Sequence, residues 1–268
     1  MDLQLRNKTA VITGSTAGIG LAIASLLAHE GAKVIINGRT QDRVDEAARR
    51  IGTSSEEDSR EHRVRGVAAD LATAHGVEEF VRQVPEVDIL VNNLGIFEPK
   101  PFEEISDQDW FRFFETNVLS GVRLSRAYLP RMRERNWGRV VFVSSESGLQ
   151  IPAEMIHYGM TKTAQIAIAR GLAETCVGTG VTVNAVLPGP TASEGVKEFV
   201  GSLAEQNKQT REEFEKEFFK SARPTSLLQR FAKPDEVAPL VAYLCSPLSS
   251  ATNGAALRVD GGVVKSPF

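Results

Sequence analysis

Short runs of β-branched and aliphatic residues recur along the chain, separated by longer segments with helical spacing. Within the runs Val, Ile and Leu are nearly continuous and do not alternate with polar residues, which is typical of strands buried on both faces of a parallel sheet. Seven strands are predicted, at 9–14, 32–37, 64–70, 87–93, 139–145, 181–189 and 256–262.

The segments between the runs carry apolar residues three and four positions apart, as amphipathic helices do. They predict helices at 18–30, 41–51, 76–84, 107–134, 155–177 and 234–245. Alternating strands and helices indicate an α/β doubly wound Rossmann fold, in which helices flank a seven-stranded parallel sheet. No linker or repeat interrupts this alternation, so we expect one domain over residues 1–268.

One segment, residues 190–223, departs from this rhythm because polar and charged residues replace the expected crossover helix. Phe199, Val200 and Leu203, followed by Phe214 and Phe218, fit two amphipathic helices. Two interpretations stay open: a helical pair packed on its own domain, or a helical insertion that forms a lid over the substrate.

Composition narrows the classes of partner. The 268 residues are 42% hydrophobic and carry a formal net charge of −3, which gives no basic field for nucleic acid or anionic membrane. The N-terminus lacks a secretory signal and no stretch has the length of a membrane span, so we expect a cytoplasmic protein. Cys176 and Cys245 have no metal-ligand spacing, so neither a disulfide framework nor a metal site is predicted.

A glycine-rich turn, Thr13 to Gly20, directly follows the first predicted strand and opens a helix. Glycine allows a tight turn and lets backbone N–H groups and the helix N-terminus approach a pyrophosphate. The spacing differs from G-x-G-x-x-G, and such a turn can also be merely structural.

The end of the second strand bears on the choice of cofactor. An NAD site of this kind usually has an acidic side chain there to bind the ribose 2′-hydroxyl, whereas this sequence has Gly38 followed by Arg39. A guanidinium suits a 2′-phosphate, which Ser15 and Thr16 can also contact through their hydroxyls, so NADP(H) is predicted. The alternative is that Arg39 merely faces solvent.

Tyr158 and Lys162 form a Y-x-x-x-K pair, which places both side chains on one face of a helix. A phenol with a pKa near 10 transfers protons poorly at neutral pH, so we expect the Lys162 ammonium to lower the pKa of Tyr158. Ser145 ends the fifth strand and Asn117 lies in the long helix before it. By itself the Tyr–Lys pair also occurs by chance on solvated helix faces.

Taken in order, these motifs resemble the short-chain dehydrogenase family over essentially the whole chain. T-G-x-x-x-G-I-G is similar to its cofactor-binding turn, and Asn92-Asn93-Leu94-Gly95 resembles its N-N-A-G motif, with Leu94 in place of alanine. The resemblance implies a catalytic set of Asn117, Ser145, Tyr158 and Lys162, in which Asn117 positions a water that links Lys162 to solvent. It also implies that Asp70 contacts adenine and that the chain forms a homotetramer or homodimer. The expected cofactor-binding residues are Gly14, Ser15, Thr16, Gly18, Ile19, Gly20, Arg39, Asp70, Leu71, Asn93, Gly95, Tyr158, Lys162, Pro188, Gly189 and Thr191.

The resulting hypothesis is an NADP(H)-dependent oxidoreductase that interconverts a ketone and a secondary alcohol, with Tyr158 as general acid and base. Alternatives are a catalytically silent NADP(H)-binding sensor and, more narrowly, a 3-oxoacyl-thioester reductase. Sugar-nucleotide epimerases share Y-x-x-x-K, but they usually show a different glycine spacing and a larger C-terminal domain. The expected partner is a small carbonyl or alcohol substrate. Glu146, Gln150, Glu154 and His157 are candidates to line its pocket, His157 least so.

Overall fold

The described residues form seven strands, which lie in one parallel sheet. The computed structural model describes residues 1–53, 64–196, 200–201 and 209–267. The strands follow the order β3-β2-β1-β4-β5-β6-β7, which confirms the predicted sheet. Their bounds are Thr9–Ile12 (β1), Lys33–Gly38 (β2), Val64–Ala68 (β3), Ile89–Asn92 (β4), Gly138–Val143 (β5), Val181–Pro188 (β6) and Ala256–Val259 (β7).

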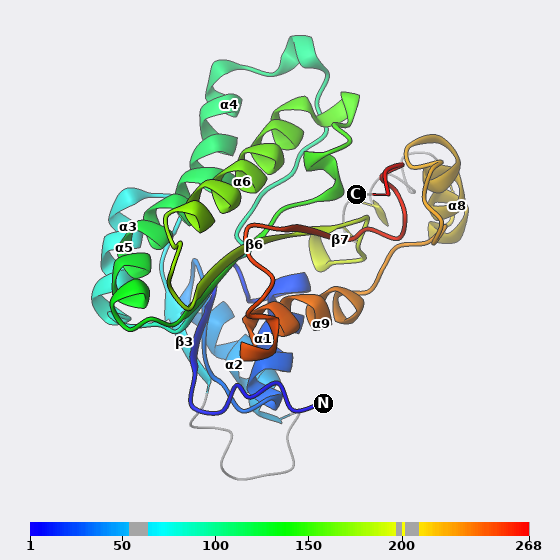
Figure 1. Ribbon diagram of the computed structural model, residues 1–268. Helices are drawn as coiled ribbons and strands as arrows, with labels where there is room; N and C mark the ends of the chain where they lie inside the picture. Colours follow the sequence, from blue (N-terminus) through cyan, green and yellow to red (C-terminus); the bar gives the residue numbers. More distant parts are fainter. Residues whose placement is uncertain (54–63, 197–199, 202–208, 268) are drawn as a thin grey trace.

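Helices cover both faces of this sheet (Figure 1). One face packs against α1 (Gly18–His29), α2 (Gln41–Thr53) and α9 (Pro234–Cys245), and the other against α3 (Ala74–Gln83), α5 (Ser120–Glu134) and α6 (Ile156–Glu174). Alternation along β1 explains the two cores, because Ala10 and Ile12 enter the first and Val11 enters the second. Both faces are therefore apolar, as the continuous Val and Ile runs predict.

The sheet order changes direction at β1, which pairs with β2 on one side and with β4 on the other. Helices after β1 and β4 therefore leave toward opposite faces, and a crevice opens at the carboxyl ends of these strands. Ligands of doubly wound folds bind in this crevice. The loops that follow β1, β4, β5 and β6 all end at this edge.

The predicted helix 107–134 is not a single α-helix. It consists of α4 (Asp107–Phe114), a π-helical segment η3 (Glu115–Leu119) and α5. Ser106 begins α4 with a capping box that it shares with Asp109. The wider π turn contains Asn117, and such turns are frequent at functional sites.

The described part of the segment 190–223 contains α8 (Arg211–Ser221), which lies at one side of the molecule near the C terminus (Figure 1). Thr210 and Glu213 form its capping box. The aromatic rings of Phe218, Phe219 and Phe231 pack together with centroids 5.1–5.2 Å apart. Of the other predicted helix, Phe199 and Leu203 lie outside the described residues, while Val200 is buried.

Several loops contain short 3-10 turns. They are η2 (Phe102–Glu104), η4 (Glu146–Gly148), η5 (Ala153–Met155) and η6 (Pro247–Ser249). The second of them begins immediately after Ser145, whose hydroxyl accepts a hydrogen bond from the Ser147 backbone N–H at 3.1 Å. This contact holds the loop that follows β5.

Candidate active site

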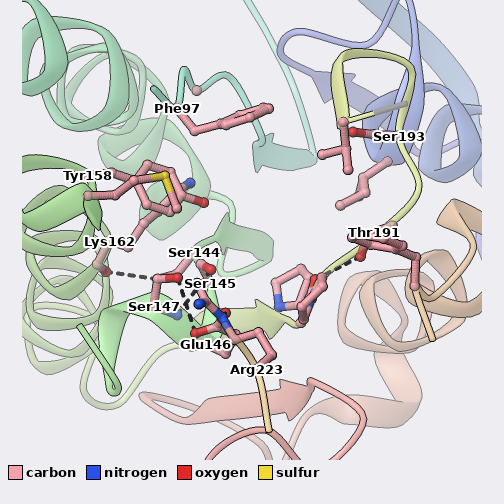
Figure 2. A pocket seen from close by; sticks show the side chains of 18 of the residues that line it. Phe97, Ser144, Ser145, Glu146, Ser147, Tyr158, Lys162, Thr191, Ser193 and Arg223 are labelled. Carbon is pink, nitrogen blue, oxygen red and sulfur yellow. Dashed lines mark hydrogen bonds and ion pairs between the residues drawn. The ribbon is translucent and has the colours of Figure 1, made fainter. Parts of the chain in front are cut away.

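A cavity of about 230 Å³ opens at the carboxyl edge of β4, β5 and β6 (Figure 2). Ser145, Tyr158 and Lys162 line it together with Phe214 and Phe218 of α8. The α8 helix thus supplies one wall of the cavity, and the lid over the substrate stays a prediction. The remaining lining residues include Ile19, Asn93, Gly95, Phe97, Glu146, Ser147, Met155, Pro188, Gly189, Thr191, Ser193, Val196, Val200, Arg223 and Phe231.

Three predicted catalytic residues meet in this cavity. Ser145 follows β5, while Tyr158 and Lys162 lie one turn apart in the first half of α6. The Lys162 Nζ atom is 5.6 Å from the centroid of the Tyr158 ring. Figure 2 shows the two α6 side chains on the side of the cavity opposite Thr191. Two elements adjacent in the fold therefore deliver a hydroxyl, a phenol and an amine to one place.

The pKa of Tyr158 moves in the direction opposite to the one expected. Burial raises the pKa of Tyr158 to about 12, and the nearby negative charge of Glu146 adds to the rise. A side-chain hydrogen bond with Ser145 and the positive charge of Arg223 oppose it without reversing it. The expectation that Lys162 lowers the pKa of Tyr158 is therefore wrong for the protein without cofactor. The Tyr158 phenol keeps its proton at neutral pH.

Lys162 is 5% exposed, and its burial lowers the pKa of the amine to about 7. The Nζ atom donates hydrogen bonds to the Val143 carbonyl at 3.0 Å and to the Gln165 side-chain oxygen at 3.2 Å. A Cβ atom at Gly95 would stand 3.4 Å from Nζ, so a residue without a side chain faces the amine. These hydrogen bonds fix the Lys162 amine in place, and its pKa lies near neutral pH.

Asn117 is buried behind Lys162 in the π turn. Its side chain accepts a hydrogen bond from the Ile96 N–H at 2.8 Å and donates to the Thr161 hydroxyl at 3.0 Å. Its backbone carbonyl accepts from the Gln165 amide at 2.6 Å. The Gln165 side chain thus joins the Asn117 backbone carbonyl to the Lys162 amine. The water that the resemblance places between Lys162 and solvent stays a prediction.

The glycine-rich turn leaves the N-terminus of α1 open to an anion. Ala17 is the N-cap and forms no side-chain cap, and the first turn contains no acidic residue. Gly14 and Gly18 have φ angles of 58° and 57°, a region that favours glycine. A Cβ atom at Gly20 would lie 2.6 Å from the Gly14 carbonyl oxygen. These features fit the pyrophosphate of a dinucleotide.

Ser15 shapes this turn from inside. Its hydroxyl donates to the Ile12 carbonyl at 2.6 Å and accepts from the Asn37 N–H at 3.0 Å, and the residue is fully buried. The expected contact of this hydroxyl with a 2′-phosphate is therefore replaced by a structural role. Thr16 instead packs against Gly38, where a Cβ atom would stand 2.5 Å from the threonine methyl group.

Arg39 follows Gly38 at the end of β2 and is exposed. Since the Thr16 methyl group occupies the space beside Gly38, an aspartate at position 38 would not fit without a shift. Arg39 is therefore the charged side chain at the end of β2, where the ribose 2′ position of the cofactor is expected, and position 38 supplies no carboxylate there.

The ends of β1 and β4 are tied together beside the turn. The Asn93 side chain donates to the carbonyl oxygens of Thr13 and Gly14 at 2.9 and 3.0 Å, so it fixes the glycine-rich loop. Asp70 is exposed after β3, whereas Leu71 is buried in a core cluster. Leu71 therefore packs inside the fold, and a contact with cofactor through its side chain would require it to leave that core.

Of the four polar candidates near Tyr158, Glu146 lines the cavity and Glu154 reaches it only through Arg223. Gln150 is exposed and does not line the cavity. His157 is fully buried beside the ring of Phe113, at a centroid distance of 4.0 Å, and it too does not line the cavity. The low expectation for His157 agrees with this position.

The family model for short chain dehydrogenases matches residues 8–202 of the chain. The protein belongs to the short-chain dehydrogenase family. The uncharacterized oxidoreductase YvaG of Bacillus subtilis is 52% identical to this chain over 268 residues, and the alignment covers 100% of both proteins.

Two further relatives of this short-chain dehydrogenase are named for their activities. The 3-oxoacyl-[acyl-carrier-protein] reductase FabG of Aquifex aeolicus is 33% identical, with 98% of this chain and 100% of the relative covered. The solved structure of L-sorbose reductase from Gluconobacter frateurii, complexed with NADPH and L-sorbose, has a TM-score of 0.92 and 33% identity. The superposition covers 99% of this chain and 100% of the L-sorbose reductase chain. The oxidoreductase class is thereby shown.

Two further observations concern the described part of this short-chain dehydrogenase. None of its described helices is both long enough and apolar enough to cross a membrane. Its described His, Cys, Asp and Glu side chains form no group of three or more that could hold a metal ion.

Gln165 and Arg223 are the site residues that the sequence alone does not reveal. Gln165 follows Lys162 by three positions, so helical spacing places the two on neighbouring faces, but the link to Asn117 depends on the π turn. Arg223 lies far along the chain from Glu146, and no spacing rule connects them.

We expect Gln165→Glu to move the alkaline limb of the pH profile for ketone reduction to higher pH. A carboxylate beside Nζ favours the charged amine and should raise the pKa of Lys162 by roughly one to three units. Gln165→Met, which has similar volume and no charge, should lower the rate without this displacement. The measurement is kcat/KM against pH for the three proteins. Equal displacement in both variants would show that Gln165 has only a packing role.

Proposed function

We propose that this short-chain dehydrogenase is an NADPH-dependent reductase that converts a ketone into a secondary alcohol. The observation that carries the proposal is the meeting of Ser145, Tyr158 and Lys162 in a cavity at the crevice of the doubly wound sheet. This is where such folds bind dinucleotides, so the reacting groups and the expected cofactor site coincide.

The residues present suit a nicotinamide dinucleotide. The uncapped N-terminus of α1, with the glycine-rich turn before it, would hold the pyrophosphate, and Arg39 would bind the 2′-phosphate. Lys162 would hold the nicotinamide ribose. When bound, the cofactor supplies the hydride for carbonyl reduction, while the protein supplies orientation and charge. The relationship to the NADPH-bound L-sorbose reductase structure supports the choice of NADPH.

Tyr158 is suited to give a proton to the carbonyl oxygen. Because burial raises its pKa to about 12, the phenol is protonated at neutral pH and serves as a general acid without prior titration. The reverse reaction would need the phenolate, which the same burial disfavours. The protonated phenol is thus the form that the reduction step needs.

Ser145 and Lys162 would stabilise the charge that develops during this proton transfer. The Ser145 hydroxyl lies beside the phenol and would donate to the substrate oxygen as negative charge grows. The Lys162 ammonium would stabilise the phenolate that remains after Tyr158 gives up its proton. Asn117 and Gln165 keep Lys162 in position.

The test is consumption of NADPH with a panel that contains L-sorbose, other ketoses, 3-oxoacyl thioesters, diketones and simple ketones. Turnover of at least one ketone to its secondary alcohol, identified by product analysis, supports the proposal. Tight NADPH binding, without turnover of any ketone, would instead favour the silent sensor. Preference for the thioesters would narrow the function to 3-oxoacyl-thioester reduction.

Replacing Arg39 by alanine should raise the KM for NADPH about 10- to 100-fold, because a hydrogen bond to a charged group contributes roughly 1.5–3 kcal/mol. The KM for NADH should stay nearly unchanged, since NADH has no 2′-phosphate. Arg43→Ala is the control, because Arg43 lies in the first turns of α2 and pairs with Glu194. Equal losses for both cofactors, or a higher activity of the parent with NADH, would contradict the assignment of Arg39.

Self-association is part of the proposal. Phe111 is 70% exposed and Phe114 is 38% exposed on α4, at the start of the predicted helix 107–134. Covering such rings from water is favourable, which supports a homodimer or homotetramer. Light scattering coupled to gel filtration measures the state directly.

A further inference from the structure

A buried ion pair forms part of the wall beside the reacting groups. Glu146 and Arg223 both line the cavity and are 3% and 6% exposed. The Arg223 Nε atom donates to Glu146 Oε1 at 2.8 Å (Figure 2). The reaction described above does not use this pair. Its position nevertheless matters, because Glu146 directly follows Ser145 and both charges influence the pKa of Tyr158.

The charges of this wall do not balance. The Arg223 Nη1 atom also donates to Glu154 Oε1 at 3.1 Å, so one guanidinium serves two carboxylates. Asp260 is close enough for its charge to act on Glu146 as well. Glu146 accepts one further hydrogen bond, from the Ser147 hydroxyl at 3.1 Å. Burial raises the pKa of Glu146, while Arg223 and the Ser147 hydroxyl favour its charged form. With Glu146, Glu154 and Asp260 ionised beside one guanidinium, the cluster has a net negative charge.

Among the described lining residues, a substrate carboxylate would find no unpaired cation away from the catalytic end of the cavity. Lys162 and Arg223 are the two basic side chains among its described lining residues. Lys162 lies at the catalytic end, where the carbonyl oxygen reacts, and Arg223 is already paired. Most other walls are apolar, including Phe97, Phe214 and Phe218. Moving a carboxylate out of water beside a negative cluster is unfavourable.

A neutral hydroxyl group would meet a different environment. It can donate to a carboxylate oxygen of Glu146 and accept from the guanidinium of Arg223 without adding charge. Phe97, across the cavity in Figure 2, and Phe218, whose ring centroid is 5.8 Å from the Arg223 guanidinium carbon, offer apolar surface to the C–H groups of the same molecule. We infer that the Glu146–Arg223 pair makes this pocket select a neutral, hydroxyl-bearing ketone and reject keto acids, an inference that rests on the proposed ketone reductase function.

The experiment compares ketones of matched shape that differ in charge. L-Sorbose and 5-keto-D-gluconate share one carbon skeleton, in which a carboxylate replaces a terminal hydroxymethyl group. The compounds 4-hydroxy-2-butanone and acetoacetate form a smaller pair of the same kind. For each pair we expect kcat/KM with NADPH to be at least about tenfold higher for the neutral ketone.

Variants identify the residue responsible. Glu146→Gln removes one negative charge from the wall and the charge partner of the Arg223 Nε atom, while Nη1 keeps its contact with Glu154. The ratio of keto-acid to neutral-ketone kcat/KM should therefore rise about tenfold or more. Glu154→Gln is the matched control, because it removes the same charge from the same arginine at a side chain that is 48% exposed. Its effect on the ratio should be clearly smaller. NADPH affinity, measured by fluorescence titration, shows that each variant is folded.

The outcomes separate this inference from the function on which it rests. Absence of turnover for every ketone would overturn the reductase function and the inference with it. Turnover in which the keto acids equal or exceed their neutral partners would overturn the inference alone. Should Glu146→Gln fail to fold, the two ratios measured for the parent enzyme still decide, since they need no variant.

Discussion

Tyr158→Phe will lower kcat for NADPH-dependent ketone reduction by about 10³-fold, within the range of 10² to 10⁴ that positioned general acids supply. The variant loses one hydroxyl group and keeps the ring that packs above Lys162. NADPH affinity should therefore change by less than about threefold, as expected when only the reacting proton is removed. Single-turnover kinetics with saturating NADPH measure the chemical step directly.

The matched control for this variant is Tyr128→Phe. Tyr128 is also buried, its hydroxyl donates to the Val84 carbonyl at 2.8 Å, and it lies in the core far from the cavity. That substitution should cost stability of about 1 kcal/mol and leave kcat within about twofold. A Tyr158→Phe enzyme that keeps more than a tenth of the parent kcat would refute the assignment of the phenol as proton donor.

Lys162→Met will abolish most activity and yet stabilise the protein at neutral pH. The pKa of this lysine falls from 10.5 to about 7 on folding, so at pH 7 its burial acts against the folded state by on the order of 4 kcal/mol. Methionine removes this cost, but it also leaves the Val143 carbonyl and the Gln165 side-chain oxygen without a hydrogen-bond donor. The loss of these hydrogen bonds offsets part of the stabilisation. A net increase of about 1–2 kcal/mol in the free energy of unfolding is expected.

The pH dependence of this gain has a definite sign. Below pH 7 the amine is protonated in both states, and the cost of burying the charge is complete. Between pH 7 and 10.5 the unfolded chain binds the proton and the folded chain does not, so the advantage of methionine shrinks as the pH rises. Because the lost hydrogen bonds of Nζ are a cost at every pH, the gain should vanish at about pH 8 to 9, and above pH 10.5 the variant should be less stable than the parent. Urea unfolding of both proteins at several pH values measures this, with the exposed Lys220 replaced by methionine as the control.

The activity loss in Lys162→Met should reach about 10²- to 10³-fold, because both the charge beside Tyr158 and the expected ribose contact disappear. This single substitution should therefore raise the free energy of unfolding at pH 7 and lower the activity. A variant that is less stable than the parent at pH 7 would show that the hydrogen bonds of Nζ outweigh the burial of its charge.

The sheet could be predicted from sequence because its signal is local. Runs such as Lys33–Gly38 and Val181–Pro188 are rich in Val, Ile and Leu and buried at nearly every position, and a parallel sheet covered by helices is the fold that buries both of their faces. The meeting of Ser145, Tyr158 and Lys162 also followed, since parallel strands and their following helices bring such residues to one edge.

What could not be predicted depends on contacts between distant residues or on small departures from ideal geometry. The π turn at Glu115–Leu119 keeps the apolar spacing of a helix, so the pattern gives one continuous helix over 107–134. The inward-facing hydroxyl of Ser15 and the raised pKa of Tyr158 both follow from burial. The pairing of Arg223 with Glu146 requires the chain after β6 to return over the site.

The central place of β1 has a consequence for synthesis of the chain. Val11 pairs with Ile35 as soon as β2 has formed, but its other neighbour, Leu90, is made only after β3 and α3. During that interval the bare edge of β1 presents unpaired backbone groups beside apolar side chains, a surface that templates aggregation. The nascent protein is thus most vulnerable between the synthesis of β2 and that of β4, and the arrival of Ile89–Asn92 closes the exposed edge.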